Sequence, residues 1–131
     1  MPPEPGSAPD WLRFARSDLG IAQGPPAPGV LREMLCFHAQ QAVEKSVTAV
    51  LLAHGIAFPR AHNLRILFDL LPPMIPAPGE VEEAIGLSDY AATLRYPGEY
   101  EPVSEEDWQR AVRLAERVVL WAENALANAS R

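Results

Sequence analysis

Prolines divide this sequence into segments, and this division constrains the fold more than any other feature. The fourteen prolines form three clusters and three single breaks, at residues 2–9, 25–28 and 72–78 and at Pro59, Pro97 and Pro102. Between the breaks apolar residues recur every three to four positions, the period of an α-helix, and no segment alternates strictly as a half-buried strand does. The sequence therefore predicts an all-α protein.

The longest segment predicts a central helix from about Val30 to His54. Gly55 follows it and suits the left-handed conformation that closes many helices. The preceding helix begins at Ser7 or Asp10, either of which can accept hydrogen bonds from unpaired backbone amides. A helix as long as the central one can form the axis of a bundle.

Three helices are expected in the second half, from His62 or Asn63 to Leu71, from Glu80 to about Leu94, and from Ser104 onward. Ser104 and Asp107 have the spacing of a capping box. These lengths and the short connections predict an antiparallel up-and-down four-helix bundle with an additional short helix. One domain is expected to span residues 1–131, with residues 1–8 flexible.

Apolar stripes predict the buried faces of the first two helices. In the first helix the stripe comprises Trp11, Phe14 or Ala15, Leu19 and Ala22. In the second it comprises Leu31, Leu35, His38, Ala42, Lys45 or Ser46, Ala49, Leu52 and Ala53. Because an unpaired buried charge is costly, His38 and Lys45 must find partners or reach solvent.

Charge limits the nucleic-acid partners that this chain can have. The formal net charge is −6, whereas nonspecific nucleic-acid binding depends on Lys and Arg side chains that neutralise phosphates. Broad coating of RNA or DNA is therefore disfavoured. A local basic pocket formed by Arg60, Arg65 and Arg95 stays possible, because charge acts locally as well as through its sum.

A cytoplasmic protein without membrane contact is expected. The longest apolar run is too short to cross a bilayer, and the N-terminal Met-Pro-Pro-Glu-Pro-Gly has neither the basic start nor the apolar core of a secretory signal. The single cysteine, Cys36, cannot form an internal disulfide, which fits a reducing compartment.

The densest chemical pattern places His38, Gln41 and Lys45 along one side of the central helix, at spacings of three and four. Such a row can contact a ligand. Alternatively, His38 and Gln41 form hydrogen bonds inside the bundle while Lys45 reaches its edge. Both interpretations stay open at this stage.

Metal and cysteine chemistry are disfavoured. Cys36 and His38 are two residues apart on a helix and point in different directions, and His54 and His62 add no spacing typical of a zinc site. No cofactor and no metal site are therefore expected. The carboxylates show no readable pair for acid–base catalysis, and most of the following are expected on solvated faces: Asp18, Glu44, Glu80 and Glu82.

A turn after the fourth helix combines Arg95 with Tyr96 and Tyr100. A guanidinium can bind phosphate with two parallel hydrogen bonds, and aromatic rings can stack on bases. The turn is therefore a candidate site for a nucleotide or an RNA end. A surface turn in which Arg95 pairs with Glu99 or Glu101 is equally compatible.

These residues resemble the HEPN family, the higher eukaryote and prokaryote nucleotide-binding domain. The most specific parts of the resemblance are Cys36–Lys45 (CFHAQQAVEK) and Arg95-Tyr96-Pro97. Further matches extend it over nearly the whole chain, at Trp11, Asp18-Leu19, Gly55, Pro59–Leu64 and Leu71. The resemblance implies a bundle of four main helices that forms a homodimer, often with a minimal nucleotidyltransferase as partner, in pairs that behave as toxin and antitoxin.

The resemblance also implies a nucleotide or polynucleotide site, for which the candidate residues are Gln41, Lys45, His62, Arg95 and Tyr96. Many HEPN proteins that cut RNA carry an Arg followed roughly four to six residues later by His. Here no histidine follows Arg95, so the expected proton-transfer group is missing. A dimeric nucleotide-binding or interaction module is expected; the alternatives are a metal-independent ribonuclease that uses His62 or Tyr96 instead, and a purely structural bundle.

Overall fold

The computed structural model describes residues 2–60, 63–93 and 102–129, and the regular structure of these residues is entirely helical. The expected all-α class is therefore confirmed. The elements are α1 (Ala8–Gln23), α2 (Arg32–Ala53), α3 (Leu64–Phe68), α4 (Gly79–Glu83), the 3₁₀-helix η1 (Ala84–Leu87), α5 (Ser88–Thr93) and α6 (Glu105–Ala129).

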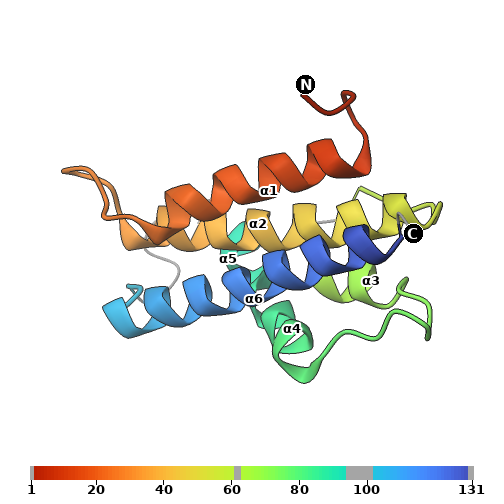
Figure 1. The fold of residues 1–131 in the computed structure, drawn as a ribbon. Helices are drawn as coiled ribbons and strands as arrows, with labels where there is room; N and C mark the ends of the chain where they lie inside the picture. Colours follow the sequence, from red (N-terminus) through yellow and green to blue (C-terminus); the bar gives the residue numbers. More distant parts are fainter. Residues whose placement is uncertain (1, 61–62, 94–101, 130–131) are drawn as a thin grey trace.

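The central helix α2 lies between α1 and α6, and both long helices follow it along most of its length (Figure 1). The backbone amide of Val103 donates a hydrogen bond to Glu33 Oε1 at 2.9 Å, which places the start of α6 beside the start of α2. Helix α6 therefore runs in the same direction as α2, while α1 runs in the opposite direction (Figure 1).

The run from α4 to α5 returns the chain antiparallel to α6. Glu80 lies 3.5 Å from Arg117, and Glu83, further along the run, lies 3.0 Å from Arg110, which comes earlier in α6. Taken in chain order, α1, α2, the α4–α5 run and α6 thus alternate in direction. This is the up-and-down bundle that the sequence predicted.

The starts of α1 and α6 have the capping hydrogen bonds that the sequence predicted. Ser7 Oγ accepts a hydrogen bond from the amide of Asp10 at 3.3 Å and caps α1. At the start of α6 the Asp107 amide donates to Ser104 Oγ at 3.0 Å and the Ser104 amide donates to Asp107 Oδ2 at 3.3 Å, so the capping box is confirmed.

Gly55 has φ +68° and closes α2, as expected. The amide of Ile56 donates to the Leu51 carbonyl at 2.9 Å and that of Gly55 to the Leu52 carbonyl at 3.0 Å, which together form a Schellman motif.

Helix α2 begins two residues after the predicted start at about Val30, and the inward position predicted for Leu31 was wrong. The Val30 amide donates to the carbonyl of Ala27 at 3.0 Å in a turn, so the helix begins only at Arg32. Leu31 precedes the first turn and is 58% exposed. At the other end of the predicted stripe, Ala53 is also exposed, whereas Val50 and Leu51 of the same turn are fully buried.

In α1 the buried member of the pair left open by the sequence is Ala15, whereas Phe14 is 49% exposed. Trp11 and Leu19 are half-buried at the margin of the core, and Ala22 is fully buried. Helix α1 therefore presents a large aromatic side chain to solvent.

The helix predicted from Glu80 to Leu94 is broken into α4, η1 and α5. Gly86 lies at its centre and weakens an α-helix there. Ser88 reinforces the break, because its hydroxyl donates to the Ile85 carbonyl at 2.8 Å and accepts from the Leu64 amide at 2.9 Å. The short helix α3 ends at Phe68 and not at Leu71, since Pro72 and Pro73 disfavour helical geometry before them.

No helix in the part of the chain that the structure describes is both long and apolar enough to cross a membrane.

Candidate functional site

Asp18 of α1 joins His38 and Lys45 of α2 into one cluster, which we call the Asp18 cluster. Its Oδ1 lies 2.9 Å from His38 Nδ1, and its Oδ2 accepts a hydrogen bond from Lys45 Nζ at 2.6 Å. The Asp18 side chain is 10% exposed, whereas those of His38 and Lys45 are 28% and 22% exposed. The lysine and the histidine that interrupt the apolar stripe of α2 therefore both find their partner on α1.

The Asp18 contact also determines which ring nitrogen of His38 carries the proton when the ring is neutral. Because a carboxylate accepts but cannot donate, the proton of the neutral ring lies on Nδ1 and Nε2 is left as an acceptor. The ring is further held edge-on against Phe37, with 5.6 Å between the ring centroids. The cluster therefore fixes an oriented imidazole at the margin of the α1–α2 interface.

Most of the four carboxylates named from the sequence were expected on solvated faces, but Asp18 is buried. It is 7% exposed in the bundle because α1 packs along α2 at this point. A signal for the contact was present in the sequence: two cationic or polar side chains on a buried stripe require a counter-charge. Asp18 lies five residues before the end of α1 and His38 lies six residues after the start of α2, and the packing of this antiparallel pair brings the two together.

Gln41 belongs to a second polar network on α2. Its side-chain amide donates to Gln40 Oε1 at 2.7 Å, and the amide of Gln40, which is fully buried, donates to Glu44 Oε1 at 3.3 Å. Gln41 and Lys45 thus share a half-buried side of α2, but their side chains engage different partners.

Of the other candidate residues, His62, Arg95 and Tyr96 lie outside the described residues, so their roles stay predictions.

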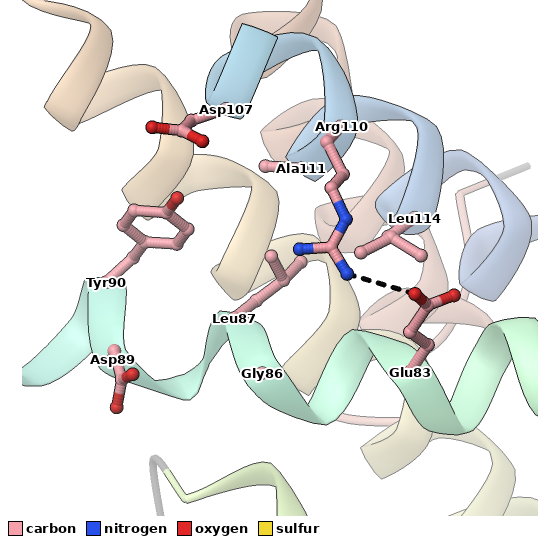
Figure 2. Close-up of a pocket in the computed structure, with 9 residues that line it drawn as sticks. All are labelled: Glu83, Gly86, Leu87, Asp89, Tyr90, Asp107, Arg110, Ala111 and Leu114. Carbon is pink, nitrogen blue, oxygen red and sulfur yellow. Dashed lines mark hydrogen bonds and ion pairs between the residues drawn. The ribbon is translucent and has the colours of Figure 1, made fainter. Parts of the chain in front are cut away.

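A pocket of about 200 Å³ lies between the η1–α5 run and the first half of α6 (Figure 2). We call it the α5–α6 pocket; its polar lining comes from Glu83, Asp89, Tyr90, Asp107 and Arg110. Figure 2 shows Arg110 extending across the pocket to Glu83, at 3.0 Å, with the Tyr90 ring on the opposite side. The pocket lies beside α5 and the start of α6, which residues 94–104 connect along the chain.

The charges of this lining do not by themselves form an anion site. The described lining carries three carboxylates and one guanidinium, so its formal charge is −2. Any phosphate bound here would require cationic groups from elsewhere, because like charges in a partly enclosed site repel.

Behind the pocket, Tyr90 contacts Cys36, which is fully buried in α2. Burial raises the pKa of the Cys36 thiol to about 11 and that of the Tyr90 hydroxyl to about 12. Both groups therefore keep their protons at neutral pH, and Cys36 lacks the thiolate that a nucleophile requires. It is a small core residue, as the sequence indicated.

Within the ranges 2–60, 63–93 and 102–129, no three His, Cys, Asp or Glu side chains are grouped so that they could hold a metal ion.

The sequence profile of the HEPN domain matches residues 8–125, which is most of the chain. The all-α bundle is therefore that of a HEPN protein, and this chain belongs to the HEPN domain family. Among curated proteins, none matches the chain significantly.

Two solved structures are similar to it. The crystal structure of TT1696 from Thermus thermophilus shares 29% sequence identity, covers 91% of this chain and 98% of its own, and superimposes with a TM-score of 0.74. That of an archaeal HEPN homologue shares 27% identity, with 92% and 98% coverage and a TM-score of 0.72.

Proposed function

We propose that this chain is a dimeric HEPN module that binds a nucleotide or an RNA end and works with a minimal nucleotidyltransferase in a toxin–antitoxin-like pair. The observation that carries the proposal is the HEPN match over residues 8–125. The binding residues proposed are Gln41, Lys45, His62, Arg95 and Tyr96.

Charge supports a small, local site over extended nucleic-acid binding. The chain has a net charge of −6, and the described lining of the α5–α6 pocket is also negative. In this setting a guanidinium at Arg95 would supply the concentrated positive charge that a phosphate requires. A mononucleotide or a strand end is therefore favoured over a long duplex.

Thermal unfolding tests nucleotide binding. A ligand that binds only the folded state raises the melting temperature by mass action. We expect at least one nucleotide of a panel to raise the Tm of the wild type, and the increase to be lost in Arg95→Ala. Unchanged melting with every nucleotide would move the assignment to a protein-interaction module.

Exposed apolar side chains support the proposed homodimer. Val30, Leu31 and Met34 are each between 42% and 58% exposed, just before and at the start of α2. Large apolar groups gathered on a surface commonly mark an interface. Light scattering should give about twice the 14.4 kDa of the chain, and a monomer mass at high concentration would contradict dimerisation.

The partner is tested by co-purification. A tagged copy of the chain, expressed from its natural source, should retain a protein with the glycine and aspartate motifs of a nucleotidyltransferase. Recovery of the tagged chain alone, with neither such a protein nor a bound nucleotide, would count against the paired function.

A metal-independent ribonuclease has less support, because no histidine follows Arg95. Cleavage of structured RNA in the presence of a chelator would establish this alternative, and intact RNA at high protein concentration would exclude it.

A further inference from the structure

A groove of about 390 Å³ lies between the N-terminal turn of α1 and Lys45 on α2, away from the α5–α6 pocket. Its lining is Gly6, Asp10, Trp11, Phe14 and Lys45, and we call it the aromatic groove. Trp11 and Phe14 stand one turn apart on α1 and supply most of its wall. Such a mostly apolar hollow with a few polar groups is typical of small-molecule sites.

The polar groups of the groove are held in place by contacts within the protein. Asp10 Oδ2 accepts a hydrogen bond from the amide of Gly6 at 3.0 Å, and Oδ1 accepts from Arg13 at 2.9 Å. Lys45 is anchored by Asp18 at 2.6 Å, and its ammonium lies 5.9 Å from the centroid of the Phe14 ring. The groove therefore combines a fixed acceptor, a fixed donor and two aromatic side chains.

Charge indicates which ligands fit. Each cation at the groove is matched by a carboxylate: Arg13 by Asp10 and Lys45 by Asp18. The formal charge of these four groups is zero, so a phosphate would gain little there. A neutral planar ring would instead pack against Trp11 and Phe14, and the nearby ammonium would favour its aromatic face.

We propose that the aromatic groove binds the base of the nucleotide. A nucleobase carries ring nitrogens or carbonyl oxygens that can accept a hydrogen bond from Lys45, because the ammonium has hydrogens beyond the one donated to Asp18. Many bases also carry an amino group that can donate a hydrogen bond to Asp10. The phosphate then lies outside the groove, toward groups that are not part of it. This proposal rests on the nucleotide binding proposed above and specifies where the base is held.

The indole N–H signals of the three tryptophans provide the test, in ¹H–¹⁵N correlation spectra of the full chain. Trp11 lines the groove, whereas the Trp108 indole donates to the Ala22 carbonyl at 2.7 Å and Trp121 stacks on Phe68. Adenosine, guanosine, cytidine and uridine are titrated separately, with inorganic phosphate as a further sample. The signal of Trp11 is identified by its loss in Trp11→Phe.

At least one nucleoside should shift the Trp11 signal saturably, while the Trp108 and Trp121 signals and the phosphate sample stay unchanged. Phe14→Ala should raise the nucleoside Kd roughly tenfold, since a base loses an aromatic contact. Phe14→Leu keeps apolar bulk and should retain part of the affinity. Ile21→Ala is the matched control, because Ile21 is 48% exposed on the same helix, and it should bind like the wild type.

Each other outcome overturns the proposal in a different way. If a nucleotide raises the Tm but leaves Trp11 unchanged, nucleotide binding stands and the groove is not its site. If the Trp11 signal moves with protein concentration in the absence of ligand, a second copy of the chain covers the groove. If no nucleoside or nucleotide changes either the Tm or the indole signals, both the groove proposal and nucleotide binding fail.

Discussion

The Asp18 carboxylate accepts a hydrogen bond from Lys45 Nζ at 2.6 Å and links α1 to α2. With His38 on its other oxygen, Asp18 is largely removed from water and depends on these two partners. The same lysine lines the aromatic groove, so one residue connects the stability of the α1–α2 pair with the proposed ligand site.

Lys45→Met should destabilise the protein by about 2 kcal/mol, because it keeps the apolar stem but leaves Asp18 buried beside His38 alone. Urea unfolding measures this change. Asp18→Asn/Lys45→Met should cost less than the sum of the two single changes, since it removes the charge that Lys45→Met strands.

Arg16→Ala is the control for this prediction. Arg16 lies 3.4 Å from Glu123, with both side chains well exposed, and such surface pairs contribute about 0–1 kcal/mol. Equal losses in Lys45→Met and Arg16→Ala would contradict the structural role of the Asp18 cluster. A loss of stability in Lys45→Met with an unchanged nucleotide Kd would support the purely structural interpretation of this lysine.

Replacing Gly24 or Gly20 by alanine should change the stability of the protein in opposite directions. Gly24 has φ +69°, and an added Cβ would lie 3.1 Å from Pro26 and 3.2 Å from the Trp108 ring, so Gly24→Ala should cost about 1–3 kcal/mol. Gly20 is exposed in the last turn of α1 and has nothing near its Cβ position, so Gly20→Ala should stabilise by about 0.5–1 kcal/mol. Thermal melting of both variants checks the difference in sign.

Alkaline pH should destabilise the protein through Cys36. Burial raises the pKa of its thiol from 9.0 to about 11, so between these values the folded state keeps a proton that the unfolded chain has released. The free energy of unfolding therefore falls as pH rises through this window. Urea unfolding at pH 8 to 11 should show a steeper decline for the wild type than for Cys36→Ala, and parallel curves would contradict it.

Local signals predicted the helices of this fold well. The capping residues Ser7 and Ser104 and the closing Gly55 act through hydrogen bonds and dihedral angles within a few residues of the chain, so the sequence contains them directly. The break of the α4–α5 run was missed because it depends in part on Ser88, whose hydroxyl accepts a hydrogen bond from the backbone of the neighbouring helix α3. A contact of that kind cannot be read from periodicity.

The candidate site was predicted in part. Spacing placed Gln41 and Lys45 on one side of α2, where they lie, but it gave no partner for either. Asp18 was missed as the partner because it comes from another helix, and the register between two helices depends on packing. The aromatic groove was missed because it also forms between two helices. From the sequence, Phe14 was considered only as a possible core residue.

The most direct test of the proposed function is calorimetric titration of the nucleotide selected by the thermal panel into the wild type, Arg95→Ala and Arg117→Ala. Arg117 is an exposed arginine on α6, 3.5 Å from Glu80, and its loss makes the same change of charge. We expect saturable binding that is weakened roughly tenfold or more in Arg95→Ala, because a charge-assisted contact is lost, and unchanged in Arg117→Ala. Equal affinity in all three proteins, or no binding to any of them, would contradict a nucleotide site that depends on Arg95.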